Sequence, residues 1–345
     1  MFLPTDSLLE CVPNFSEGCN ESVIQAIQEA ILSVDGVQLL HIDSNRSANR
    51  TVFTFVGLPL SVCEAAFRAI EVAAINIDMS KHKGTHPRMG ATDVCPLIPI
   101  ANISIEETDS YAQKLAERVG EALSIPVYCY EFSSKRGYRK RLEQIREGQY
   151  ESLAQKQLRV GWEPDYGPKQ WNAKSGATVI GARQFLIAFN VNLATKSVDI
   201  AKRIAGDIRQ SGCTFISPSG EKSQCPGLLT QVKAIGWYIA DFDMVQVSTN
   251  ITDFTITPLY KVVETIKQRA LLYKTSVIGC ELVGMIPKKA LLETGIFYIG
   301  DNVPLTETEL INRAVRELNL SSIKPFDVTK NILENQIHGL NRSIL

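Results

Sequence analysis

The chain has 345 residues, of which 45% are hydrophobic and 21% are charged. This is the composition of an ordinary globular protein, and the length favours two domains over one. A formal net charge of −1 gives no electrostatic reason to expect binding to nucleic acid or to an anionic membrane. The sequence has no apolar run of about 18 residues and no recognisable signal peptide, so we expect a cytoplasmic protein.

The first half of the chain alternates strand and helix patterns. Strands are predicted over 37–43, 51–57, 92–100 and 125–130, and helices over 62–77, 106–123 and 135–147. Ser104 and Glu107 form a capping-box pattern at the start of the helix 106–123. Residues 161–181 carry two prolines, four glycines and two tryptophans, which predicts a long loop.

The second half repeats this mixture. Strands are predicted over 184–193, 231–240, 244–253 and 275–283, helices over 194–211, 259–273, 288–295 and 306–318, and a loop over 217–227. The pattern indicates an α+β protein with two mixed-sheet α/β subdomains, 1–180 and 181–345.

The eight cysteines are scattered along the chain, and no pair forms a C-x-x-C motif. A zinc ribbon or a thioredoxin-like motif is therefore not expected. Without an export signal we predict reduced thiols that act mostly as small core side chains. Dinucleotide-binding, P-loop and nucleophile-elbow motifs are also absent from the sequence.

The segment HKGTHPRMG at 82–90 contains two of the four histidines, two cations, two glycines and a proline. Gly84, Gly90 and Pro87 exclude a regular helix, so the segment is predicted to be a loop between the helix 62–77 and the strand 92–100. Histidine and arginine on such a loop favour a catalytic or binding role. The alternatives are a solvated basic loop and a metal site. We expect no metal, because the segment offers no further Glu or Cys ligand.

Several segments together resemble the glutamate formimidoyltransferase family. They are ECVPNFSEG at 10–18, NRTV at 49–52, IDM at 77–79, HKGTHPRMGATDVCP at 82–96, GATV at 176–179, GAR at 181–183, AFN at 188–190, AIGWY at 234–238, QVSTN at 246–250 and ELVG at 281–284. The resemblance covers roughly 8–325 and corresponds to the transferase part alone, without the cyclodeaminase domain of the bifunctional animal enzyme. Thr85 stands where glutamate is expected in animal members.

The resemblance implies transfer of the formimidoyl group from N-formimidoyl-L-glutamate to N5 of tetrahydrofolate, in histidine degradation and one-carbon metabolism. It also implies two subdomains whose sheets pack face to face with helices outside, folate held between them, and a homodimer. The family's catalytic histidine falls on His86 and an aspartate of its site on Asp43. The folate-contacting loop falls on 167–176, and with its neighbour it gives the candidates Tyr166, Gly167, Pro168, Trp171 and Gly176.

The chemistry of amidine transfer explains these assignments. The attacking amine must lose a proton and the leaving nitrogen must gain one, and a histidine such as His86 can relay it. Asp43 would orient the imidazole; the alternative is a helix or turn cap at the end of a strand. His82 is either a second polar wall of the site or a residue that holds the loop, and we favour the second role.

Other candidates would bind the carboxylates or the rings of the substrates. Arg50, Arg88 and Arg183 could bind carboxylates or could form intramolecular ion pairs. Trp171, Tyr166 and Phe189 could supply apolar walls, and Asn190, Gln246 and Asn250 polar groups, although core packing is favoured for Phe189. His41 and His338 are expected to be structural or solvated. Alternative functions are an enzyme acting on 5-formyltetrahydrofolate, a non-catalytic folate-binding protein, and an unrelated structural protein.

Overall fold

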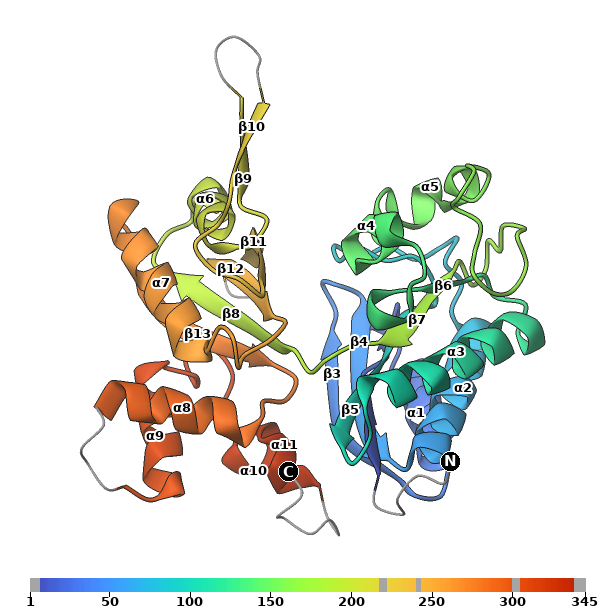
Figure 1. Cartoon of the computed structure of the whole chain (residues 1–345), viewed down its shortest axis with the longest axis horizontal. Helices are drawn as coiled ribbons and strands as arrows, with labels where there is room; N and C mark the ends of the chain where they lie inside the picture. The colour runs from blue at the N-terminus through green and yellow to red at the C-terminus, as the bar shows by residue number, and fades with distance from the viewer. Residues whose placement is uncertain (1–6, 217–221, 240–242, 300–304, 338–345) are drawn as a thin grey trace. The chain divides into compact units, whose positions relative to one another are not determined.

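The computed structural model describes residues 7–216, 222–239, 243–299 and 305–337. The chain divides into two compact units, which are described separately. Unit 1 contains the described residues up to Gln184 together with Ile337, and unit 2 contains Phe185–Gln336. Both units combine helices with β-sheet (Figure 1), which confirms the predicted α+β class. Among the described helices, none is long and apolar enough to cross a membrane.

Unit 1 is built on a seven-stranded mixed sheet. Its strands are β1 (Leu8–Cys11), β2 (Asn14–Phe15), β3 (Val37–Asn45), β4 (Arg50–Gly57), β5 (Thr92–Ala101), β6 (Val127–Cys129) and β7 (Thr178–Ala182). Its helices are α1 (Glu21–Leu32), α2 (Pro59–Asn76), α3 (Ile105–Ala122), α4 (Leu142–Arg146) and α5 (Gln149–Lys156), with short 3₁₀ turns η1 (Glu131–Ser133) and η2 (Gly137–Arg139). β5 pairs antiparallel with β1 and β2 and parallel with β7, so it links the two parts of the sheet.

Helices α1, α2 and α3 cover one face of this sheet (Figure 1). Helix α1 was not predicted, yet Val23, Ile27 and Ile31 follow the four-residue spacing of a buried helical stripe. The predicted capping box is confirmed at α3, where Ser104 and Glu107 satisfy each other's backbone amides. The resulting core contains mainly aliphatic residues from the three helices and the inner face of the sheet.

Helices α4 and α5 contribute to a second, smaller core around Met89, Val94 and Val179, through Ile145 and Leu153. This core places the two short helices beside the loop 82–90. The predicted continuous helix 135–147 is wrong. Residues 137–139 form η2 and α4 begins only at Leu142, because the guanidinium of Arg139 is buried against Asp165 and Arg141 has an extended backbone.

Unit 2 contains a four-stranded antiparallel sheet in the order β11-β12-β8-β13 and a separate hairpin, β9–β10. The strands are β8 (Ile187–Leu193), β9 (Cys213–Ile216), β10 (Lys222–Cys225), β11 (Val232–Ile239), β12 (Met244–Ile251) and β13 (Val277–Val283). The helices are α6 (Val198–Ile208), α7 (Leu259–Leu272), α8 (Lys288–Ile299), α9 (Glu307–Glu317), α10 (Val328–Asn331) and α11 (Leu333–Gln336). A core of aliphatic residues joins one face of the sheet to α6, α7 and α8.

The predicted loop 217–227 is wrong in part. Residues 217–221 lie outside the described residues, but Lys222–Cys225 form β10 and pair antiparallel with β9. All residues of β10 are exposed, so the strand can consist of polar residues such as Lys222, Ser223 and Gln224. Strand pairing, rather than hydrophobic periodicity, therefore determines this element.

Candidate functional site

The histidine loop, residues 82–90, is held against the β3–β4 connection. Asn49 lies in this connection with a φ of 48°, and its Nδ2 donates to the carbonyl of Lys83 at 2.9 Å. Gly84 packs so closely that a Cβ there would lie 2.3 Å from the carbonyl oxygen of Ala48. Thr85 donates from both its backbone N and its Oγ1 to the carbonyl of Ser47. At this end the loop is therefore fixed by hydrogen bonds and a close backbone approach.

The other end of the histidine loop is joined to the predicted folate-contacting loop. Gly90 and Gly176 form an isolated antiparallel bridge, flanked by hydrogen bonds between Ala177 N and Met89 O and between Ala91 N and Ser175 O. Gly176 has a φ of +67°, and a Cβ there would lie 2.1 Å from Met89 O. The end of the loop 167–176 thus lies directly against the histidine loop.

His86 is covered by a guanidinium. Both ring nitrogens lie within 3.0 Å of Arg50 Nη1, and Nδ1 also lies 2.7 Å from the carbonyl oxygen of Pro87. Nδ1 lies 2.5 Å from the donor Arg50 Nη1 and 2.7 Å from the acceptor Pro87 O, so it can accept from the first or donate to the second. We consider the tautomer in which Nδ1 donates to Pro87 O and the lone pair is on Nε2, 3.0 Å from Arg50 Nη1. Of the two nitrogens, Nε2 is the one with the basic lone pair in this tautomer.

Arg50 belongs to a buried charge cluster that also contains Asp93 and Arg146. Arg50 Nη1 lies 3.5 Å from Asp93 Oδ2, and its Nη2 donates to Asn14 Oδ1. Arg146 contacts the same Asp93 oxygen through Nη2 and donates from Nε to Oδ1 at 3.3 Å. The Asp93 side chain is only 2% exposed, and its Oδ1 also accepts from the backbone of Met89. Two buried cations therefore share one carboxylate.

These surroundings keep His86 neutral. Burial, the charge of Arg50 and the charge of Arg146 together lower the pKa of His86 to about 3, against the weaker effect of Asp93. Burial and the neighbouring Arg146 likewise lower the pKa of Arg50 to about 9. At neutral pH the pair therefore consists of a neutral imidazole and a guanidinium that remains protonated.

His82 and Arg88 form a second pair with a different charge balance. His82 Nε2 donates to Asn49 O at 3.0 Å, and its Nδ1 accepts from Arg88 Nε at 3.2 Å. Glu151 of α5 binds Arg88 through both terminal nitrogens, at 2.8 and 2.7 Å. The cation of Arg88 is therefore matched by its own carboxylate. Burial lowers the pKa of His82, and its contacts fit a residue that holds the loop.

The remaining candidates of unit 1 have local partners. Asp43 on β3 pairs in register with Val52 and so lies on the same sheet face as Arg50, two residues along β4. Arg183 donates to the carbonyl of Gln184, and Tyr166 donates its hydroxyl to Gln113. Trp171 packs against the Tyr150 ring, with centroids 4.9 Å apart. Gly167 has a φ of +79°, and Pro168 beside it is half-buried.

In unit 2, Asn190 and Gln246 lie in a polar cluster on one face of the sheet. Asn190 Nδ2 and Gln246 Nε2 each donate to Glu281 Oε2 at 3.1 Å, and Gln246 Nε2 also donates to Asn192 Oδ1. Phe189 points to the opposite face and is fully buried in the core of unit 2, as favoured from the sequence. Asn250 is exposed.

Sequence reasoning missed four residues of this site: Asn14, Asp93, Arg146 and Glu151. Asn14 and Asp93 do lie inside segments that carry the family resemblance, ECVPNFSEG and HKGTHPRMGATDVCP, and this signal could have marked them. Arg146 and Glu151 lie on short helices far from the histidine loop in sequence. Arg146 is 53 residues from its partner Asp93, and Glu151 is 63 residues from its partner Arg88. Only the packing of α4 and α5 brings them to the site.

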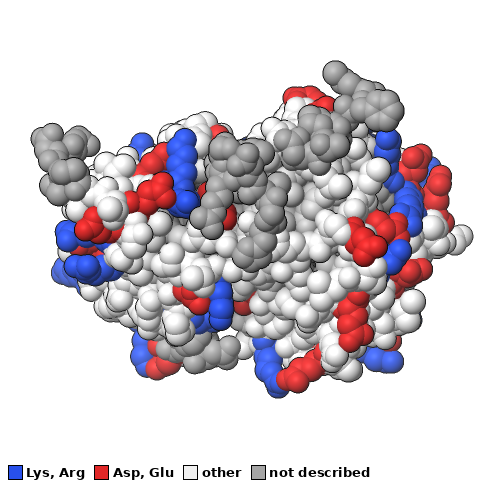
Figure 2. Space-filling model, turned by 90° about the horizontal axis from the view of Figure 1, so that it is seen from below, with Lys and Arg blue, Asp and Glu red and all other residues white. Residues whose placement is uncertain are grey.

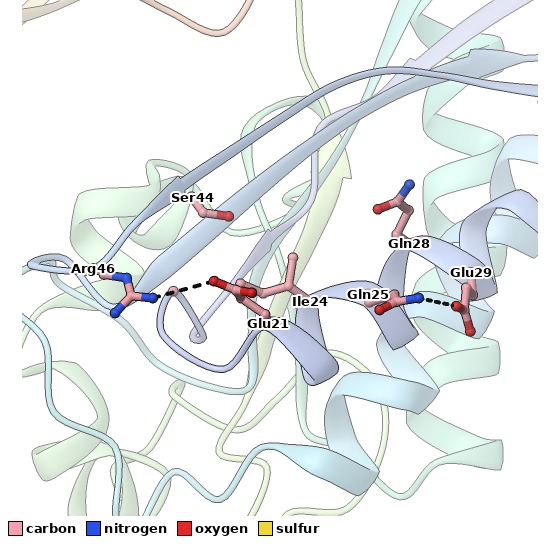
Figure 3. Close-up of a pocket in the computed structure, with 8 residues that line it drawn as sticks. Glu21, Ile24, Gln25, Gln28, Glu29, Ser44 and Arg46 are labelled. Carbon is pink, nitrogen blue, oxygen red and sulfur yellow. Dashed lines mark hydrogen bonds and ion pairs between the residues drawn. The ribbon is translucent and has the colours of Figure 1, made fainter.

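Two hollows bear on the position of the site. The larger, about 650 Å³, lies between α1 and the end of β3 and is lined by Glu21, Gln25, Glu29, Ser44 and Arg46, among others (Figure 3). It is open and contains no histidine. The smaller lies between His82, His86, Arg50 and Arg88 and has no room for a water molecule. We place the candidate site at the smaller one, because the basic and cationic side chains converge there.

The charge and metal-ligand patterns add two observations. On the molecular face shown in Figure 2, basic and acidic side chains are interspersed, without a continuous patch of either sign. Within the described parts of the chain, no group of three or more His, Cys, Asp or Glu residues is arranged to hold a metal ion.

Comparison with known proteins identifies the family. Residues 8–183 match the formiminotransferase domain, N-terminal subdomain, and residues 188–338 match the formiminotransferase domain. The chain is 45% identical to formimidoyltransferase-cyclodeaminase of Gallus gallus over 95% of its own length, but spans only 59% of that relative. It is 41% identical to glutamate formimidoyltransferase of Streptococcus pyogenes serotype M1, over 96% of this chain and 99% of that protein. A glutamate formimidoyltransferase of Thermoplasma acidophilum is 40% identical, over 86% of this chain and 93% of that protein. With both subdomain models matched in order across its length, the chain belongs to the formiminotransferase family.

Proposed function

We propose that this chain transfers the formimidoyl group from N-formimidoyl-L-glutamate to N5 of tetrahydrofolate and releases L-glutamate. The observation that carries the proposal is the fixed histidine loop, in which the neutral His86 presents its Nε2 lone pair among buried arginines. The names of the relatives that match over nearly their whole length support it. From the family resemblance we further propose tetrahydrofolate as co-substrate, a role in histidine degradation, a cytoplasmic location and a homodimer.

The proposed reaction begins with attack of N5 on the amidine carbon of the donor. The N5–H proton passes to His86 Nε2, and a tetrahedral carbon with nitrogen on both sides forms. His86 then returns the proton to the nitrogen of glutamate, and the C–N bond to glutamate breaks. The hydrogen bond from His86 Nδ1 to Pro87 O would keep the imidazole in the tautomer that this relay requires.

The other residues have supporting roles in this proposal. Arg50 and Arg146 would bind carboxylates of the donor, while Asp93 would hold Arg146 in place. Asp43 lies on the sheet face of Arg50 and remains a proposed partner of the imidazole. The loop 167–176, Arg88 and Arg183 in unit 1, and Asn190 and Gln246 in unit 2, remain proposed contacts of the substrates.

The proposal is tested by incubating the purified protein with tetrahydrofolate and N-formimidoyl-L-glutamate. Acid converts the 5-formimidoyl product to methenyltetrahydrofolate, whose absorbance is followed. We expect turnover by the wild type and a loss of about 10² to 10⁴ in kcat for His86→Ala, as for removal of a general acid–base. His41→Gln, which changes a histidine of β3, is the matched control and should retain turnover.

Two outcomes would contradict the proposal. Unchanged kcat in His86→Ala would remove the role given to His86. Absence of turnover by the wild type would remove the reaction itself. Parallel reactions with 5-formyltetrahydrofolate as the donor test the alternative of an enzyme that acts on that folate. If the protein binds folate but turns over neither donor, it is a non-catalytic folate-binding protein.

A further inference from the structure

The two arginine–histidine pairs of the site differ in charge balance. Arg88, beside His82, is bound by both oxygens of Glu151. Arg50, beside His86, shares the single carboxylate of Asp93 with Arg146. Arg50 and Arg146 are 17% and 14% exposed, so solvent does little to stabilise the unmatched positive charge. The cluster of Arg50, Asp93 and Arg146 therefore has a net charge of +1 and lacks one anion.

The same guanidinium blocks the base. Arg50 Nη1 lies within 3.0 Å of both nitrogens of His86, and the gap between the four side chains of the site has no room for a water molecule. An incoming amine could not reach Nε2 while Arg50 remains there. The distance from Arg50 Nη1 to Asp93 Oδ2 is 3.5 Å, longer than a good charge-assisted hydrogen bond, so Asp93 does not hold Arg50 tightly.

A carboxylate is the anion that fits this cluster. A guanidinium offers paired N–H donors that match the two oxygens of a carboxylate, and the proposed donor substrate carries two carboxylates. A second carboxylate beside Asp93 would give each of the two arginines its own anion, as Glu151 already does for Arg88.

We infer that Arg50 is a positioning residue that covers His86 in the free enzyme and withdraws to bind a carboxylate of the donor, so that the anionic substrate itself releases the base. Arg146 belongs to the same carboxylate subsite. The inference rests on the proposed function for the identity of the carboxylate. The movement of Arg50 itself can be tested by comparing the free protein with the anion-bound protein, without turnover.

The inference has an electrostatic consequence. The groups that face His86 are Arg50 of β4, Arg146 of α4, Asp93 of β5 and the carbonyl of Pro87. In the free protein the two cations help to lower the pKa of His86 to about 3. A histidine with such a low pKa is a weak base. A bound carboxylate cancels part of their charge, so the pKa of His86 rises toward its ordinary value. His82 should not respond, because Glu151 already neutralises Arg88.

The test is a titration of the four histidine side chains of the full chain by ¹H–¹⁵N NMR. The His86 signals are assigned with His86→Gln, and spectra are recorded with and without L-glutamate, which carries the two carboxylates but no transferable group. We expect the pKa of His86 to rise by about one unit or more with glutamate, a tenfold change in proton affinity. The pKa of His82 should stay constant and serves as the internal control.

Variants separate positioning from folding. In Arg50→Gln the pKa of His86 should already be higher without glutamate and should rise less on its addition. Arg146→Gln should also raise it and weaken glutamate binding. Arg50→Lys, which keeps the charge but loses the planar pair of donors, should keep the low pKa of free His86 and bind glutamate more weakly. In kinetics, Arg50→Gln should raise KM more than it lowers kcat.

Two results would overturn the inference. One is glutamate binding, shown by calorimetry, without any change in the pKa of His86. The other is a failure of glutamate to bind at all, since the unmatched charge is then not a carboxylate subsite. A rise in the pKa of His86 in a protein that does not turn over formimidoylglutamate would support the inference while contradicting the proposed function, so the two failures are distinguishable.

Discussion

Glu10 shows at the scale of one residue how burial changes an ionisable group. It lies in β1 between Val56 and Ile98, is 1% exposed, and its Oε2 has no hydrogen-bond partner among the described residues. Desolvation raises its pKa to about 7, and the positive charge of Arg183 only partly opposes this. The carboxyl group is therefore protonated over a pH range in which an exposed glutamate is charged.

This shift predicts a pH-dependent effect of Glu10→Gln on stability. Between about pH 4.5 and 7 the folded state holds a proton that the unfolded state has released, so the free energy of unfolding of the wild type falls as pH rises. The contribution is fully present below 4.5 and is lost as the pH passes 7. At pH 8 we expect Glu10→Gln to be more stable than the wild type by on the order of 2–3 kcal/mol.

The measurement is urea denaturation of both proteins at pH 5 and pH 8. Glu117→Gln, at an exposed position of α3, is the control and should show no pH-dependent difference. A constant difference between Glu10→Gln and the wild type at the two pH values would show that the carboxyl group does not titrate on folding.

At the scale of elements, close backbone contacts join the two loops of the site to each other. The bridge between Gly90 and Gly176 joins the histidine loop to the loop 167–176, and neither position has space for a Cβ. The sequence predicts both loops from their glycines and prolines, but it does not predict their pairing. That pairing depends on the parallel alignment of β5 and β7, which follow the two loops.

Gly176→Ala should therefore destabilise the site. The added methyl group would lie 2.1 Å from Met89 O, and the residue would need a φ of +67°, which costs a side chain on the order of 1–3 kcal/mol in strain alone. We expect a loss of stability of at least that size in urea denaturation, with lower formimidoyl transfer. Gly137→Ala is the matched control, because a Cβ there has no neighbour within 4 Å. Equal effects of the two substitutions would contradict this account.

At the scale of the whole molecule, each of the two units has its own large hydrophobic core. Ile27 and its neighbours belong to the core of unit 1, and Ile204 to that of unit 2, and both side chains are fully buried. Truncating either residue to alanine should cost about 2–5 kcal/mol. The candidate site with His86, Arg50 and Asp93 lies entirely in unit 1.

We expect each truncation to act mainly on its own unit. In urea denaturation followed by tryptophan fluorescence, Trp162 and Trp171 report on unit 1 and Trp237 on unit 2. In a Trp237→Phe background, Ile27→Ala should lower the midpoint of the remaining signal more than Ile204→Ala does. Equal shifts would show that the two units unfold as one cooperative structure.

The sequence by itself determined the α+β class, most strands and helices, the α3 capping box and the position of the histidine loop. These features depend on local patterns: alternation in strands, four-residue spacing in helices, and glycine and proline in loops. The same rules misassigned 135–147, 178–181 and 222–225. A buried Arg139–Asp165 pair interrupts the predicted helix, and strand pairing places 178–181 in β7 and 222–225 in β10 despite their local preference.

Only the tertiary structure decided which charges meet. His86 contacts Arg50 across 36 residues, Asp93 contacts Arg146 across 53, and Arg88 contacts Glu151 across 63. Spacing along the chain gives no information at these separations. The first contact arises when the histidine loop packs against the β3–β4 connection, and the other two arise when α4 and α5 pack beside the loop. The sequence could name the histidine, but its neutral state and its cover by an unmatched arginine depend on burial and on the charges of Arg50 and Arg146, which are distant in sequence.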